Sequence, residues 1–259
     1  MMEKKTNYVQ SVVRALDIIE LLNDKKEQGV TQIGQALDLD KSTVHRLLNT
    51  LKYKGYVHQN PVNLKYSNSY KLFEMGTIEI DRLGLIRRAN PYMEAIASRT
   101  RETVNLAILD GPRAMYVEKI ESSEVIKADI GVGRSYPAYA TSLGKAMLAF
   151  SPVDKVIHLF ENEEFVKFTP NTIGSLDELL AELKIVRRRG YAVDDEEFIQ
   201  GLACIAAPVR TGSGDAIAAF SISYPRYRYK SGGKEEVSME NFLLETALKF
   251  SAEFGYERS

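Results

Sequence analysis

The sequence has 259 residues and a formal net charge of −1, and its composition is 44% hydrophobic and 27% charged. These values are typical of globular proteins and exclude a fibrous or largely disordered chain. A single hydrophobic core rarely grows beyond about 250 to 300 residues, so this length favours two modest domains over one large domain. The near-neutral charge neither indicates nor excludes nucleic acid, because the placement of the basic groups decides that question.

Cys204 is the only cysteine, which excludes an intramolecular disulfide and a CxxC-type metal cluster and fits a reducing cytoplasm. The first residues lack the apolar stretch of a signal peptide, and no segment approaches the ~20 apolar residues of a membrane span. We therefore expect a cytoplasmic protein that contacts no membrane. No motif indicates a cofactor, and we expect none.

The first predicted element is an amphipathic helix that starts at Ser11. Val12, Leu16, Ile19 and Leu22 recur at steps of three and four residues, which places them on one helical face. Ser11 itself is available as the N-cap. This face is expected to be buried.

Two more helices follow. After a turn that contains Gly29, Thr31 is expected to cap a short helix that ends at Leu37. Leu39-Asp40 interrupts the helical pattern, and a third helix is predicted over about 41–52. The order of short helix, tight turn and helix is typical of a helix-turn-helix.

A hairpin and a linker complete the first part of the chain. β-like stretches near Tyr56 and Tyr66 flank the turn residues 61–63, which predicts a wing. The apolar pattern from Tyr70 to about Ile80 predicts a linking helix. We therefore expect three parts: a winged helix-turn-helix over 1–69, a linker helix over 70–82, and an effector-binding and oligomerisation domain over 83–259.

The third helix carries the candidate DNA contacts. Val44, Leu47, Leu48 and Leu51 form its buried stripe, which leaves hydrogen-bond donors on the outer face. Arg pairs with guanine and Asn with adenine in the major groove, and the first helical turn reaches deepest. Groove contacts are expected from Lys41, Ser42, Thr43, His45, Arg46 and Asn49. Phosphate contacts, which set position rather than specificity, are expected from Arg14, Lys52 and the wing residue Lys65.

An ordinary solvated helix also presents Lys, Arg and Asn outward. The hairpin directly after the helix-turn-helix, all within about 70 residues, favours DNA binding over that interpretation. The first 80 residues carry a small positive charge balance and the remainder a small negative one, which supports DNA binding only weakly.

The remaining chain is predicted to be α+β with an antiparallel sheet and packed helices. A helix over 85–100 is either kinked at Pro91 or begins there. Strand-like runs are predicted at 104–109, 114–120, 125–130, 202–209 and 216–224. Further helices are predicted at 143–150, 176–189 and 235–254.

Three segments of this part carry groups that are candidates for binding a ligand or for reactivity. The loop 141–145 leads into a helix, where free backbone N–H groups suit an anion, although simple capping explains the same residues. The four acids 194–197 are interpreted as a solvated loop or, less readily, a metal site, since no histidine lies nearby. Cys204 lies in an apolar strand, where a lone thiol is usually a small core residue. Strand alternation places it with Leu202, and Ser221 shares a face with Ser223.

Four segments resemble the IclR family of bacterial transcription regulators: SVVRALDIIELL (11–22), KSTVHRLLNTLKYKGYV (41–57), TSLGKAMLA (141–149) and GYAVDDEEFIQGLACIAAPV (190–209). The similarity extends from about Gln10 to Phe254. The wing departs from the family pattern. Leu64 stands where a glycine is common near the hairpin tip, and 67–69 is Ser-Asn-Ser where Leu-Gly is common after the tyrosine.

The resemblance implies a homodimeric or homotetrameric regulator that binds double-stranded operator DNA. Its C-terminal domain is expected to bind a small carboxylic or oxo acid, and this effector is expected to alter operator affinity by changing the placement of the DNA-binding modules. The effector residues that carry over from the family are Ala128, Ser142, Leu143, Asp194, Leu202, Cys204, Ser221 and Ser223.

Two other interpretations stay open at this point. In the first, the chain binds DNA and its C-terminal domain serves only for oligomerisation. In the second, the chain is an enzyme in which Cys204 is the nucleophile and an acid from 194–197 assists it. A nucleophilic thiol needs an adjacent base or positive charge. His45 and His58 belong to the DNA-binding part, and no motif links His158 to Cys204. We therefore expect no enzymatic activity.

Overall fold

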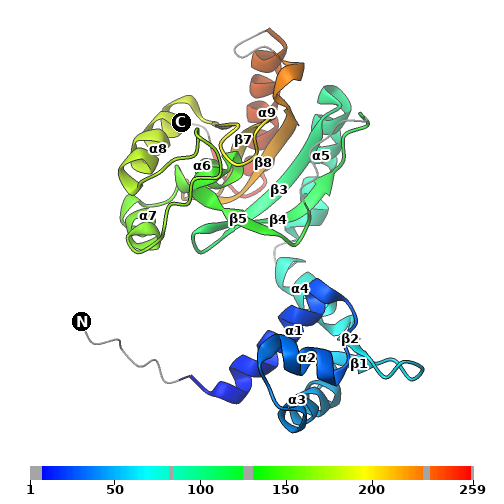
Figure 1. Ribbon diagram of the computed structural model, residues 1–259. Coiled ribbons are helices and arrows are strands. Elements are labelled where there is room, and N and C mark those ends of the chain that lie inside the picture. The colour runs from blue at the N-terminus through cyan, green and yellow to red at the C-terminus, as the bar shows by residue number, and fades with distance from the viewer. Residues whose placement is uncertain (1–7, 82–83, 125–130, 230–233, 258–259) are drawn as a thin grey trace. The chain divides into compact units, whose positions relative to one another are not determined.

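The structure is a computed structural model that describes residues 8–81, 84–124, 131–229 and 234–257. The chain divides into two compact units, residues 1–82 and 83–259 (Figure 1). In the described residues, no helix is long and apolar enough to cross a membrane. Ala128 and the strand predicted over 125–130 lie outside the described residues.

The N-terminal unit is a winged helix-turn-helix followed by a further helix. Its elements are α1 (Gln10–Lys25), α2 (Val30–Leu37), α3 (Lys41–Tyr53), β1 (Val57–Gln59), β2 (Tyr66–Asn68) and α4 (Lys71–Asp81). β1 and β2 pair antiparallel with His58 opposite Ser67. The turn between α2 and α3 is tight, because a Cβ at Gly34 would lie 2.7 Å from the carbonyl oxygen of Leu39. Gly34 therefore permits the close approach that sets α3 against α2.

The core of this unit corrects the expected face of α1. Ile18 and Leu22 are fully buried beside Val44 and Leu48 of α3, but Val12 is 56% exposed and Leu16 is 53% exposed. The buried side of α1 therefore does not include Val12 and Leu16, the two predicted core residues in the first half of the helix. α2, α3 and the wing cover only the side of α1 that carries Ile18 and Leu22, so the earlier apolar residues remain at the surface.

Two predicted N-caps are also wrong. α1 begins one residue before Ser11, its cap residue is Val9, and no side chain caps it. α2 begins at Val30 with Gly29 as its cap, so Thr31 lies inside the helix. The backbone N–H of Gly29 donates to Oε1 of Gln32 at 2.9 Å, which ties the start of α2 without a hydroxyl cap.

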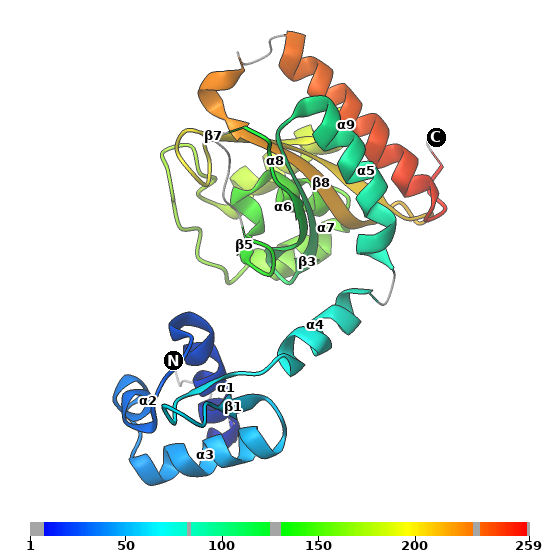
Figure 2. The same cartoon turned by 90° about the vertical axis from the view of Figure 1, so that its right-hand side faces the viewer.

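The C-terminal unit is built on an antiparallel sheet in the order β5-β4-β3-β8-β7-β6. Its strands are β3 (Thr103–Asp110), β4 (Arg113–Ile120), β5 (Ser135–Pro137), β6 (Ala192–Asp195), β7 (Leu202–Arg210) and β8 (Ala216–Pro225). Its helical elements are α5 (Leu85–Thr100), η1 (Ala138–Ala140), α6 (Ser142–Leu148), α7 (Val153–Phe160), α8 (Leu176–Arg189), η2 (Arg226–Arg228) and α9 (Lys234–Ala252). α5 and α9 lie side by side on one face, and α6 covers the other face with α7 and α8 beyond it (Figures 1 and 2).

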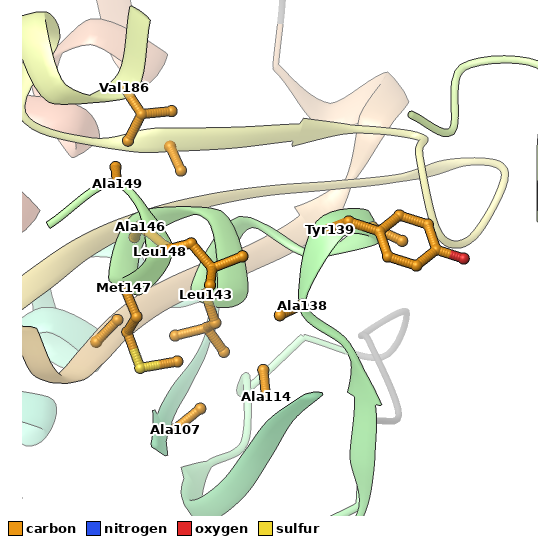
Figure 3. Packing of buried hydrophobic residues seen from close by; sticks show 14 of the residues in the cluster. Ala107, Ala114, Ala138, Tyr139, Leu143, Ala146, Met147, Leu148, Ala149 and Val186 are labelled. Carbon is orange, nitrogen blue, oxygen red and sulfur yellow. The ribbon is translucent and has the colours of Figure 1, made fainter. Parts of the chain in front are cut away.

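Helix α6 is buried along its whole length. Small strand residues such as Ala107 and Ala114 face Leu143 and Met147 of α6, which lets the helix approach the sheet closely (Figure 3). A Cβ at Gly144 would lie 2.2 Å from the carbonyl oxygen of Ala138, so only glycine fits between α6 and η1. Helix α6 thereby packs on the central strands β3, β8 and β7 of the sheet.

Several elements differ from the sequence-based expectations. α5 runs continuously from Leu85 to Thr100 with Pro91 inside it, so the helix does not begin at the proline. β5 and β6 were not predicted as strands. Strand β6 is short and its last residues are acidic, which made the segment resemble a loop.

Candidate functional site

The start of α3 is fixed by Asp40. Its Oδ1 accepts from the backbone N–H of Thr43 at 2.9 Å and from the hydroxyl of Ser42 at 2.6 Å, and its Oδ2 accepts from the hydroxyl of Thr43 at 2.6 Å. These hydrogen bonds, led by the one from Ser42, hold the pKa of the Asp40 carboxyl well below its usual range. The helix N-terminus is thus held in place, and the hydroxyl protons of Ser42 and Thr43 are committed to Asp40.

The other predicted DNA contacts lie at the surface of α3. Those exposed to solvent are Lys41, Ser42, His45, Arg46, Asn49 and Lys52, and Thr43 is half-buried. Arg14 of α1 is half-buried, and it lines a groove of about 500 Å³ together with Thr43 and Arg46. The fold therefore brings Arg14 to the edge of the α3 surface although the two helices are separated in sequence.

Side-chain hydrogen bonds connect the wing to α3 and to the segment between α1 and α2. Nζ of Lys52 donates to Oε1 of Gln59 at 3.3 Å, and Nδ2 of Asn63 donates to Oε2 of Glu27 at 3.0 Å. Leu64 has a φ of 58°, in the left-handed region that favours glycine. Lys65, the predicted phosphate contact, follows it directly and is half-buried. Leu64, which departs from the family pattern, is therefore held in a strained backbone conformation, and the β1–β2 hairpin forms nevertheless.

A polar cluster crosses the sheet of the C-terminal unit. We use this name for Asn105, Asp194, Cys204, Ser221 and Ser223. Asp194 pairs with Cys204, Cys204 pairs with Ser223, and Ser221 pairs with Asn105 in the strand register. Directly paired residues share a face, and Cys204 belongs to the apolar core under α6. The exposed fraction of each of the five side chains is at most 5%.

Asn105 is the centre of this cluster and was not predicted from the sequence. Its Nδ2 donates to the hydroxyl oxygens of Ser221 and Ser223, at 3.2 Å in each case. Its Oδ1 is buried and has no hydrogen-bond partner among the described residues. An unpaired buried acceptor costs roughly 1 to 3 kcal/mol, so this atom is suited to a bound donor.

The acid run contains two buried carboxyl groups rather than a solvated loop. Burial raises the pKa of Asp194 to about 7, and the nearby Glu197 carboxylate adds to the rise while Lys145 opposes it. Oδ1 of Asp194 accepts from the backbone N–H of Glu197 at 2.7 Å. Glu197 in turn pairs with Nζ of Lys145 at 2.5 Å, and Lys145 is 1% exposed. Asp195 alone of the four acids is exposed.

Burial also affects the Cys204 thiol of the cluster and the hydroxyl of Tyr116. Burial raises the pKa of the Cys204 thiol, and the Asp194 carboxylate raises it further, so the thiol is protonated at neutral pH. Such a thiol is a weak nucleophile, which argues against the enzyme interpretation. Burial likewise raises the pKa of Tyr116 well above its usual value, with smaller contributions from Cys204 and Asp194.

The remaining predicted effector residues lie nearby in the core. Ser142 and Leu143 begin α6, and Leu202 begins β7; each is 9% exposed or less. Thr141 caps α6 by accepting from the N–H of Gly144 at 3.2 Å, so the loop makes an ordinary cap. Among the described residues, no three His, Cys, Asp or Glu side chains converge as a metal site would require.

The sequence matches two family descriptions: the IclR helix-turn-helix domain over residues 11–61, and the bacterial transcriptional regulator IclR C-terminal domain over residues 77–252. It is 38% identical over 256 residues to the HTH-type transcriptional regulator KdgR of Escherichia coli K12, covering 98% of this chain and 96% of that protein. It is 36% identical over 252 residues to XynR of the same organism, covering 96% and 98%.

The fold agrees with these matches. It superposes on the crystal structure of the Thermotoga maritima IclR with a TM-score of 0.79 at 28% identity, over 96% of this chain and 100% of that chain. The isolated C-terminal domain of E. coli KdgR superposes with a TM-score of 0.60 at 37% identity, over 66% and 99%. The chain belongs to the IclR family of DNA-binding bacterial transcription regulators, with an N-terminal helix-turn-helix and a C-terminal ligand-binding domain.

Proposed function

We propose that the C-terminal unit binds a small carboxylic or oxo acid at the polar cluster, and that its occupancy controls operator affinity. The observation that carries this proposal is the buried Asn105 amide, which donates to two serine hydroxyls and keeps its own oxygen free to accept from an O–H group of a hydroxylated or protonated acid. Buried polar groups cost stability unless they are paired, so a purely structural sheet would fill these positions with apolar side chains. This argues against the platform interpretation.

The chemistry of the cluster favours an acid. The hydroxyls of Ser221 and Ser223 are donors for carboxylate or oxo oxygens, and the protonated form of Asp194 donates as well. Because burial raises the pKa of Asp194 to about 7, this form is well populated near neutral pH. Ser142, Leu143 and Leu202 would border the ligand, and we retain Ala128 in the set on the family resemblance.

For operator DNA, we propose that α3 enters the major groove. Arg46 and Asn49 are exposed and suited to base edges, with Lys41 and His45 beside them. Ser42 and Thr43 would accept hydrogen bonds from donors on the base edges, because Asp40 holds their protons. The contacts to phosphate would come from Arg14, Lys52 and Lys65.

We also propose that the protein acts as a homodimer or homotetramer. One recognition helix covers only a few base pairs, and two-fold symmetry supplies paired half-sites.

A thermal-shift screen tests the effector proposal. Purified protein is heated with glyoxylate, pyruvate, gluconate, galacturonate or 4-hydroxybenzoate, alongside Ser221→Ala and the exposed-turn control Ser213→Ala. A ligand at 100 times its Kd stabilises the folded state by about 2.7 kcal/mol, which is several degrees in Tm. We expect a stabilising acid whose effect is lost in Ser221→Ala and kept in Ser213→Ala. Silence from every acid, or a shift that survives Ser221→Ala, would contradict the proposal.

A further inference from the structure

A surface cavity of about 650 Å³ opens on the C-terminal unit near the polar cluster. It is lined by charged and aromatic side chains that include Arg113, Arg134, Tyr136, Phe168 and Phe198. Glu163 and Glu164 also line it, so the cavity as a whole is close to neutral and the arginines act as local contacts for an anion. The cavity is large enough for a small organic acid.

Aromatic rings separate this cavity from the polar cluster. The rings of Tyr116 and Tyr136 meet edge to face with centroids 5.2 Å apart, and those of Tyr136 and Phe198 meet in the same way at 5.1 Å. Phe168 packs edge to face against Phe198 with ring centroids 4.9 Å apart. Tyr116 is 5% exposed, whereas Tyr136 and Phe198 are half-buried and face the cavity.

The same rings also border the polar cluster on their inner side. Tyr116 and Cys204 belong to the same cluster of buried side chains, and Tyr136 and Phe198 pack against that cluster. The backbone N–H of Glu197 donates to Oδ1 of Asp194 at 2.7 Å, and the next residue in the chain, Phe198, has its side chain in the lining of the cavity. Two consecutive residues thus contact the polar cluster and line the cavity, so the separating layer is about one side chain thick.

We propose that this cavity is the access route to the polar cluster, and that a small organic acid reaches the cluster when Tyr136 separates from Phe198. The inference rests on the proposed function for the identity of the ligand. Every member of the cluster is at most 5% exposed, so a ligand reaches it only when a covering side chain moves, and Tyr136 and Phe198 are a contacting pair that lines the cavity. Rings held by edge contacts move apart at modest cost.

Cys204 offers a direct test, since it is the only cysteine and belongs to the cluster. Methyl methanethiosulfonate is the probe. The Cys204 thiolate attacks its sulfenyl sulfur to form a methyl disulfide, methanesulfinate leaves, and the thiol proton passes to solvent. The rate of this labelling, followed by intact mass, reports how often the route opens.

Tyr136→Leu and Phe198→Leu each remove two ring contacts while keeping an apolar side chain. We expect either substitution to raise the labelling rate of the full-length protein roughly tenfold. The matched control is Phe242→Leu, which truncates a half-buried aromatic ring on α9, and it should leave the rate unchanged. Melting temperatures measured in parallel identify acceleration that comes from global unfolding.

Unchanged labelling in both variants, or an equal rise in Phe242→Leu, would overturn the access route. The same assay also tests the proposed function independently of the access route, through the effect of acids on labelling. Glyoxylate or pyruvate at millimolar concentration should slow the labelling of the wild-type protein when bound beside Cys204. Failure of all five screened acids to protect Cys204 would count against the proposed function, whereas the comparison of variants judges the route.

Discussion

At the scale of single residues, Asp194 makes stability depend on pH. Its pKa in the folded protein is about 7, against 3.8 for an ordinary aspartate, because burial disfavours the charged form. Between these values the folded state holds a proton that the unfolded state has released. Stability therefore falls as pH rises from about 4 to 7, by up to about 4 kcal/mol.

Asp194→Asn should remove that dependence, because the amide stays neutral and its oxygen still accepts from the N–H of Glu197. Urea unfolding at pH 5 and pH 8 measures the effect. The wild type should lose stability between the two values, and the variant should lose clearly less. The control is Asp195→Asn, an exposed neighbour that should retain the wild-type slope. An Asp194→Asn slope equal to that of the wild type would show that this carboxyl is already ionised at pH 5.

Leu64 carries strain in the wing. A non-glycine residue in the left-handed region costs about 1 to 3 kcal/mol, and glycine recovers this at an entropic cost of about 0.5 to 1 kcal/mol. Leu64 has a φ of 58° and is 63% exposed, so its side chain contributes little packing. Leu64→Gly should therefore slow amide hydrogen exchange in residues 57–68 about fivefold, whereas Leu64→Ala should leave it near the wild-type rate. Faster exchange in the glycine variant would mean that the leucine side chain stabilises the hairpin.

At the scale of elements, the sequence pattern was sufficient where periodicity is strong. The predicted third helix over 41–52 corresponds to α3, Lys41–Tyr53, because an apolar stripe repeats along it. The pattern did not predict the buried face of α1, because that face depends on which other elements pack against the helix. Val12 and Leu16 have the correct spacing and yet face outward.

The candidate effector site shows the same limit. Alternation placed Ser221 with Ser223, but the pairing of Cys204 with Ser223 depends on strand register, which no local pattern encodes. Asn105 was missed because a single amide in an apolar strand carries no spacing signal. Lys145 and Glu197 are separated by 52 residues, so their contact is visible only in the fold.

The recognition helix supports a prediction at this scale. Arg46 is exposed on α3, and loss of a bidentate arginine–guanine contact costs about 1 to 3 kcal/mol. Arg46→Ala should weaken binding about ten- to hundredfold on a duplex selected from a random library with the wild-type protein. Fluorescence anisotropy measures the affinity, and circular dichroism checks the fold. The control Arg188→Ala changes an exposed arginine of α8 and should bind as the wild type does. Full affinity in Arg46→Ala would exclude this residue from the groove.

At the scale of the whole molecule, two compact units must communicate if an acid in one controls DNA binding by the other. Such coupling is a free energy shared by both binding events. The acid must therefore change operator affinity by the same factor by which the operator changes acid affinity. Couplings of this kind are typically about 5- to 150-fold.

Reciprocity can be measured on one preparation. Operator affinity is determined by anisotropy with and without a saturating amount of the acid found in the screen, and acid affinity is determined by calorimetry with and without the operator duplex. We expect equal factors in the wild type. In Ser221→Ala, operator affinity without acid should be unchanged and its response to acid should be lost, because the change lies in the polar cluster and not in α3. An acid that binds at the cluster but leaves operator affinity unchanged would mean that the C-terminal unit binds ligand without regulating DNA binding.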